Sequence, residues 1–251
     1  MKKHIPNIIT CCNLICGCIA IIYALRFNPQ MALLFIILGA VFDFFDGMSA
    51  RLLGVSSEIG KELDSLADDV TFGVAPASMI FAELSVLEYP SFLVDNAMWL
   101  VSLMPYMAYL VAAFSAIRLA KFNLDTRQTT SFIGLPTPAN ALFWGSLIVG
   151  FSPLFEHHQW FTVLVFAGIF ISCWLLVAEI PMFALKFKHW SFRSNKLKYG
   201  FIIFSAIILI ASIAYGLITV HTQLCWGGFS IVIVAYVIIS IVNGRHSEQK
   251  P

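Results

Sequence analysis

Acidic residues are concentrated in one short part of this 251-residue chain. Seven of its fourteen acidic residues fall between positions 43 and 69: Asp43, Asp46, Glu58, Glu62, Asp64, Asp68 and Asp69. The flanking sequence is strongly apolar, and carboxylates at membrane depth are costly and repel one another. We therefore expect a bound cation or a chemical function to compensate this charge.

Four of these aspartates have helical spacing. Asp43 and Asp46 lie three residues apart, so they share one face of a helix. Asp64 and Asp68 lie four apart and share a face in the same way. Two facing helices that each present such a pair can hold one or two hard divalent cations through oxygen ligands alone. No pair of His or Cys residues with ligand spacing lies nearby, so Mg²⁺ or Mn²⁺ fits better than zinc.

Small and basic residues accompany the aspartates. Gly47 and Ala50 continue the stripe of the first pair and leave open space in front of the carboxylates. Arg51 would offer a guanidinium group to phosphate oxygens, and Gly60 would allow a ligand to approach closely the loop before the third predicted helix. Cations, an arginine and a steric gap together predict a binding site for a diphosphate.

The elements that carry these residues are predicted to be membrane helices. The chain is 59% hydrophobic and only 12% charged, which is unusual for a soluble domain. Continuous rather than alternating apolar runs argue against a β-barrel. We predict an all-α integral membrane protein, a polytopic bundle of about eight transmembrane helices. The predicted spans are about 8–26, 31–53, 63–84, 97–118, 138–153, 158–181, 199–220 and 225–243.

Positive charges predict the orientation of these spans. Fourteen of the fifteen Lys and Arg residues fall at the ends and in alternate connections, among them Lys2, Lys3 and the basic stretch 184–198, and only Arg26 falls on the other side. The positive-inside rule then places both termini, and the acidic cluster, on the cytoplasmic side of the cell's inner membrane. No linker or internal repeat interrupts the chain, so we expect a single domain over residues 1–251.

The acidic segment also matches a known pattern. It contains Asp43-x-x-Asp46-Gly47-x-x-Ala50-Arg51, then eight residues, Gly60, three residues, Asp64, three residues and Asp68. This segment resembles the signature of the CDP-alcohol phosphatidyltransferase family, with every fixed position and spacing present. Residues 5–10, 63–76, 118–123 and 134–139 are in addition similar to one branch of that family, the membrane phosphatidylserine synthases of bacteria.

The resemblance implies a set of ligands and partners. It implies two divalent cations among the four aspartates and a catalytic core at about 5–140, and we expect this core to be followed by C-terminal helices at about 158–243. It also implies that Gly47, Ala50 and Arg51 hold the CDP portion of the lipid, with Asn7 and Thr10 nearby. The expected substrates are CDP-diacylglycerol and L-serine in a lipid membrane, and the expected assembly is a homodimer that binds no nucleic acid.

The expected reaction assigns roles to four further positions. The serine hydroxyl would attack the phosphorus that carries the diacylglycerol, and CMP would leave, as in other phosphoryl transfers assisted by metal ions. Asp68 is the predicted general base for the hydroxyl proton. The segment that begins at residue 118 is the predicted acceptor site, through Arg118, Lys121 and Asn123.

Two other functions remain open at this point. A phosphatidylglycerophosphate synthase shares the signature, but it must bind a dianionic acceptor and should show additional basic residues near the site. A membrane carrier could also combine eight helices with intramembrane acids. Its site would lie near mid-membrane on broken and repeated helices, whereas these acids lie at the predicted cytoplasmic end.

Overall fold

The computed structural model describes residues 4–55, 57–125, 132–155, 157–183, 195–219 and 221–248. The elements in chain order are α1 (His4–Leu25), α2 (Pro29–Leu53), α3 (Glu58–Asp68), the π-helix η1 (Asp69–Val74), α4 (Ala75–Leu84), α5 (Ser91–Asn96), α6 (Met98–Leu103), the 3₁₀-helix η2 (Met104–Tyr109), α7 (Leu110–Leu124), β1 (Phe132–Ile133), α8 (Thr137–Phe155), α9 (Gln159–Val177), β2 (Pro181–Met182), α10 (Lys196–Ile218) and α11 (Leu224–Glu248). The prediction of an all-α polytopic membrane protein is confirmed.

Seven helical stretches within the described residues are long and apolar enough to cross a membrane. They are His4–Leu25, Pro29–Leu53, Met98–Leu124, Thr137–Phe155, Gln159–Val177, Lys196–Ile218 and Leu224–Asn243. The remaining predicted span, 63–84, coincides with α3, η1 and α4, which follow one another without a break and which we call the central rod. It is not among the seven, and its first part, α3, is rich in charged residues.

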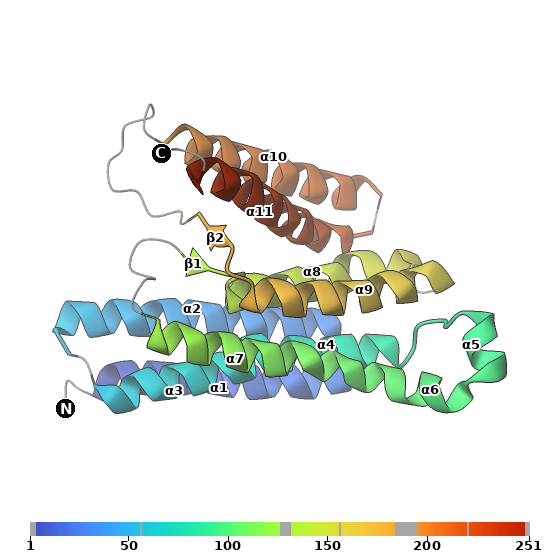
Figure 1. Ribbon diagram of the computed structural model, residues 1–251, viewed down its shortest axis with the longest axis horizontal. Helices are drawn as coiled ribbons and strands as arrows, with labels where there is room; N and C mark the ends of the chain where they lie inside the picture. The colour runs from blue at the N-terminus through green and yellow to red at the C-terminus, as the bar shows by residue number, and fades with distance from the viewer. Residues whose placement is uncertain are drawn as a thin grey trace.

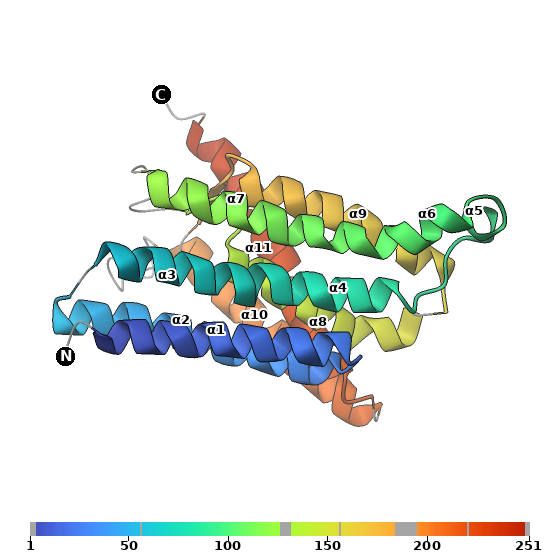
Figure 2. The same ribbon diagram turned by 90° about the horizontal axis from the view of Figure 1, so that it is seen from below.

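The helices lie lengthwise beside one another, and α1 begins at the end of the bundle where α11 finishes (Figure 1). The central rod runs between α1 and α2 on one side and α7 on the other (Figure 2). The α10–α11 hairpin packs onto the rest of the molecule mainly through contacts of α11 with α8. Strands β1 and β2 pair antiparallel and connect the segment before α8 to the segment after α9.

Local signals fix the turn that joins α2 to α3. α2 ends at Gly54, whose φ of 62° lies in the left-handed region that glycine adopts without strain. α3 begins after Ser57, whose Oγ accepts a hydrogen bond from the Gly60 N–H at 3.0 Å. This short reversal brings the C-terminal half of α2 opposite α3, so the two aspartate pairs are carried by neighbouring helices.

A contact of η1 with α1 and α2 fixes the position of the central rod against these two helices. Thr71 of η1 lies against Gly17 of α1 and Gly39 of α2, and a Cβ at either glycine would overlap the threonine side chain. The Thr71 Oγ1 also donates a hydrogen bond to the Asn13 carbonyl oxygen at 3.0 Å. Small residues of this kind let membrane helices approach closely. We call these residues the Thr71 contact.

Several residues used in the topology prediction fall outside the described part of the chain. They are Lys2, Lys3, Arg127, residues 184–194 of the basic stretch, and Lys250. The orientation of the bundle therefore stays a prediction.

Candidate active site

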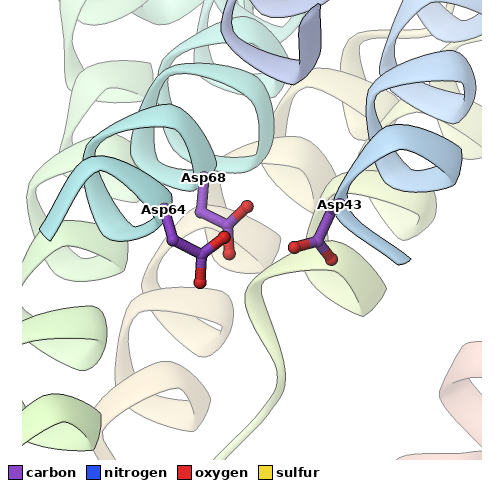
Figure 3. Close-up of side chains that lie close together, drawn as sticks. All are labelled: Asp43, Asp64 and Asp68. Carbon is purple, nitrogen blue, oxygen red and sulfur yellow. The ribbon is translucent and has the colours of Figure 1, made fainter. Parts of the chain in front are cut away.

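Three of the four predicted metal ligands converge. Asp43 from α2 and Asp64 and Asp68 from α3 each offer a carboxylate oxygen, and these oxygens lie within 4.8 Å of one another. Figure 3 shows the two α3 side chains pointing across the gap toward Asp43. We call these three residues the carboxylate trio. Asp43 precedes Asp64 by 21 positions in the sequence, and the turn after α2 brings the two helices together.

The donor set of the carboxylate trio fits a hard divalent cation. Among the residues that the structure describes, no lysine or arginine forms an ion pair with the trio. The Oδ1 atom of Asp64 is buried and has no hydrogen-bond partner. Carboxylate groups held this close repel one another unless a cation or protons neutralise them. All-oxygen ligands of this kind suit Mg²⁺ or Mn²⁺.

Asp46, the fourth predicted ligand, lies one helical turn from Asp43 but outside the carboxylate trio. Its side chain is 6% exposed, and its Oδ2 accepts a hydrogen bond from Thr10 Oγ1 at 2.7 Å. The same threonine hydroxyl lies 3.0 Å from the Pro6 carbonyl oxygen. α1 therefore orients Asp46, and it does so through a residue that the resemblance had placed near the CDP portion.

Asn13 is a site residue that the sequence analysis missed. It is fully buried, and its Nδ2 donates a hydrogen bond to Asp68 Oδ1 at 3.1 Å. The Thr71 contact holds the Asn13 backbone, so this amide has a fixed position relative to Asp68. A signal for it exists in the sequence, because Asn7, Thr10 and Asn13 form a polar stripe at three-residue spacing on an apolar helix.

An open cavity of about 260 Å³ adjoins the trio, between the first turns of α1, the last turns of α2 and the start of α3. Its lining includes Asn7 and Thr10 from α1, Asp46, Gly47 and Ala50 from α2, and Gly60, Lys61 and Asp64 from α3. Its volume is near the lower end of that of small-molecule sites, roughly 300 Å³. Because Asp64 belongs both to the trio and to this lining, a ligand in the cavity would lie beside a bound cation.

The two glycines of this cavity differ in their surroundings. A Cβ at Gly47 would meet no atom within 4 Å, so packing does not require a glycine there. A Cβ at Gly60 would lie 2.9 Å from Ser57 Oγ and 3.1 Å from Asn7 Oδ1. Gly60 thus allows α1 and α3 to approach each other, whereas Gly47 leaves open space in the cavity, as expected where a ligand approaches the helix closely.

The basic side chains near the cavity are arranged differently from what the sequence predicted. Arg51 is exposed and does not line the cavity, whereas Lys61 does. Lys61 Nζ donates a hydrogen bond to the Asn123 carbonyl oxygen at 2.8 Å, and Asn123 Nδ2 donates to Ser65 Oγ at 2.7 Å. Asn123 therefore joins the end of α7 to α3, while the neighbouring Lys121 is exposed.

Arg118 lies deeper in the molecule than its charge alone would suggest. It is only 7% exposed, and its Nη1 donates a long hydrogen bond of 3.5 Å to Thr137 Oγ1 at the start of α8. Its guanidinium carbon lies 5.5 Å from the centre of the Phe122 ring. A buried arginine needs compensating partners, so this one is a candidate to bind an anionic group.

Comparison with known proteins identifies the family to which the chain belongs. The profile of the CDP-alcohol phosphatidyltransferase family matches residues 3–174, which is more than half of the chain and includes the carboxylate trio, the cavity and Arg118. The chain belongs to this family. The match ends within α9, so the α10–α11 hairpin lies outside the matched residues. Membership in a family of transferases favours an enzyme over the carrier that the sequence alone had left open.

Several curated relatives carry the same name, CDP-diacylglycerol–serine O-phosphatidyltransferase. The relative from Bacillus subtilis is 40% identical over 136 residues, which cover 54% of this chain and 70% of that protein. One from Methanocaldococcus jannaschii is 32% identical over 202 residues, 72% of this chain and 87% of that protein. One from Mycobacterium leprae is 31% identical over 188 residues, 71% of this chain but only 57% of that protein.

Proposed function

We propose that this protein transfers the phosphatidyl group of CDP-diacylglycerol to L-serine and releases CMP. The observation that carries the proposal is the carboxylate trio beside an open cavity, in a chain that belongs to the CDP-alcohol phosphatidyltransferase family. The choice of serine rests on the shared name of the relatives from two bacteria and an archaeon.

The metal site in this proposal holds two divalent cations, Mg²⁺ or Mn²⁺. Asp43, Asp64 and Asp68 are the ligands supported by their mutual distance, and Asp46 is the fourth ligand that the family signature implies. When bound, such cations supply electrostatic stabilisation to the diphosphate and to the departing CMP phosphate. The hydrogen bond from Thr10 holds Asp46 in place for this role.

The reaction itself is a single displacement at phosphorus. The serine hydroxyl oxygen forms a bond to the phosphorus that carries the diacylglycerol, and the bond from that phosphorus to the CMP oxygen breaks. Asp68 accepts the hydroxyl proton, so it is the proposed general base. Asn13 is a positioning residue, because its N–H fixes one carboxylate oxygen of Asp68 and leaves the other available.

The cavity receives the CDP portion of the lipid. Gly47 and Ala50 leave room for the nucleotide close to the α2 backbone, and Gly60 lines the cavity on the side of α3. Lys61 supplies a positive charge from the lining, and Arg51 supplies a second one from the exposed end of α2. Asn7 and Thr10 close the cavity on the side of α1.

The acceptor binds where α7 meets α3. Arg118 is the proposed partner of the serine carboxylate, since it is buried and its guanidinium retains unused donor capacity. Lys121 and Asn123 form the outer edge of the same region, where Asn123 also fixes α7 to α3. We further propose that the site opens to the cytoplasm from the inner membrane and that the enzyme works as a homodimer.

The test is CMP release by the purified full-length protein, supplied with CDP-diacylglycerol in detergent micelles and with Mg²⁺ or Mn²⁺. L-serine and glycerol 3-phosphate are offered in separate reactions. Release that depends on both serine and the cation is the expected result. Release with glycerol 3-phosphate alone would assign the acceptor of a phosphatidylglycerophosphate synthase instead. Release with neither acceptor, from protein that still binds CDP-diacylglycerol, would contradict the proposed transferase activity.

A further inference from the structure

A second group of polar side chains lies on the side of the central rod that faces α7. Asp69 directly follows Asp68, and it is the first residue of the π-helix η1. A Cβ at Gly73 would lie 2.6 Å from Asp69 Oδ1 and 3.1 Å from Ser115 Cβ. The side chains of Asp69 and Ser115 therefore meet over Gly73. η1 and α7 pack extensively against each other at this place.

The group continues along α7 and onto α8. Arg118 follows Ser115 by one helical turn, and both side chains are buried, so they share the inner face of α7. The Arg118 Nη1 contacts Thr137 Oγ1 at 3.5 Å. Asn140 lies one turn after Thr137 on α8 and is fully buried. A carboxylate, hydroxyls and a guanidinium are thus brought together where η1, α7 and α8 meet. Asn140 lies on the same helix as Thr137 and also lines a cavity between α8, α9 and α11.

Most hydrogen-bonding atoms of this group have no partner. The buried atoms without one include Asp69 Oδ1, Ser115 Oγ, Arg118 Nε and both amide atoms of Asn140. A buried polar atom that lacks a partner is costly, and natural proteins contain few of them. Five such atoms on three adjoining elements are therefore unusual as a purely structural arrangement. They are expected where a polar ligand supplies the missing hydrogen bonds.

We propose that Asp69, Ser115, Arg118 and Asn140 form the binding site for the amino-acid part of the acceptor, with Asp69 as the partner of its ammonium group. This inference rests on the proposed function and deepens it, because the ammonium partner and the roles of Ser115 and Asn140 are new. Arg118 binds the carboxylate. Asn140 offers a donor and an acceptor, and Ser115 offers a hydroxyl, so every polar group of a zwitterion finds a complement.

Charge explains why such a site would select an amino acid. One half-buried carboxylate and one buried guanidinium match the opposite charges of a zwitterion, which carries no net charge. A dianionic acceptor such as glycerol 3-phosphate would be repelled by Asp69, and an amino alcohol without a carboxylate would leave Arg118 unpaired. Specificity arises from these unfavourable combinations as much as from the favourable one. Asp69 and Asp68 are consecutive on the rod, and their side chains face α7 and α1 respectively.

The experiment compares wild type with Asp69→Asn, which keeps the size of the side chain and removes its charge. The KM for L-serine and the KM for CDP-diacylglycerol are measured separately. Inhibition by 3-hydroxypropionate, which has the hydroxyl and carboxylate of serine but no amino group, is measured as well. We expect the KM for serine to rise about tenfold or more, and the KM for CDP-diacylglycerol to stay within about twofold. Inhibition by 3-hydroxypropionate should be unchanged or stronger.

Two further variants sharpen this test. Glu62→Gln is the matched control, because Glu62 is an exposed carboxylate on the same rod. Asn140→Ala should raise the KM for serine and weaken inhibition by 3-hydroxypropionate together. The inference is overturned if Asp69→Asn behaves like Glu62→Gln, or if both substrates lose affinity equally. A wild type that uses only glycerol 3-phosphate would instead refute the proposed function, and this inference with it.

Discussion

At the scale of single residues, Asp68 has more roles in the proposed reaction than any other side chain. It belongs to the carboxylate trio, it accepts a hydrogen bond from Asn13, and it adjoins Asp69. Asp68→Asn keeps the shape of the side chain but removes its charge and its ability to accept a proton. We expect kcat to fall by about 10²–10⁴-fold, the usual contribution of a general base. CMP release measured beside Asp95→Asn, an exposed aspartate of α5, checks this.

The glycine at position 47 gives a second prediction at the residue scale. Nothing crowds a Cβ at Gly47, and glycine in a helix interior costs roughly 0.5–1 kcal/mol relative to alanine. Gly47→Ala should therefore raise the melting temperature while it increases the KM for CDP-diacylglycerol. Gly200→Ala is the matched control, because Gly200 is also uncrowded and lies in α10, away from the cavity. A Gly47→Ala protein with an unchanged KM would show that the cavity does not bind the CDP portion.

Much of the candidate site could be predicted from residue spacing. The signature from Asp43 to Asp68 identified the trio, Asp46 and the small residues of the cavity, since these features are local in the sequence. Asn13 could not be identified in this way, because its contact with Asp68 crosses 55 positions and depends on how α1 packs against α3. Lys61 lines the cavity directly after Gly60, although the signature does not specify that position.

At the scale of elements, the Thr71 contact holds α1, α2 and the central rod together and so fixes the distance between Asp43 and Asp68. Gly39→Ala should reduce stability by about 1–3 kcal/mol, because a Cβ there would overlap Thr71. Thr71→Ala removes that side chain, so the double variant should be less destabilised than the sum of the two single variants. Thermal unfolding in detergent measures all three proteins. Additive effects would mean that Gly39 and Thr71 do not contact each other.

The central rod also shows the limit of hydropathy as a guide to elements. The sequence predicted a span at about 63–84, but the π-helix Asp69–Val74 within it was not visible in an apolar window. A π-helix is defined by its backbone hydrogen bonds, which composition does not specify. In this chain it begins at Asp69, the residue that faces α7 while its neighbour Asp68 faces α1.

At the scale of the whole molecule, the orientation of the bundle in the membrane is a prediction from the sequence. α1 begins and α11 ends at the end of the bundle near the carboxylate trio, so the two termini are predicted to share a side (Figures 1 and 2). The positive-inside rule predicts that this side is cytoplasmic. A green fluorescent protein fused after residue 251 should fluoresce, and alkaline phosphatase inserted near Asp95 should be active outside. An active phosphatase at the C-terminus would reverse the orientation.

The central claim concerns which bonds form and break, and isotope labelling tests it most directly. L-serine labelled with ¹⁸O in its hydroxyl group is supplied to the purified protein with CDP-diacylglycerol and Mg²⁺, and both products are analysed by mass spectrometry. Attack by the serine hydroxyl on phosphorus predicts ¹⁸O in phosphatidylserine and none in CMP. CMP formed without labelled phosphatidylserine would contradict the account, because the phosphatidyl group would then have gone to another acceptor.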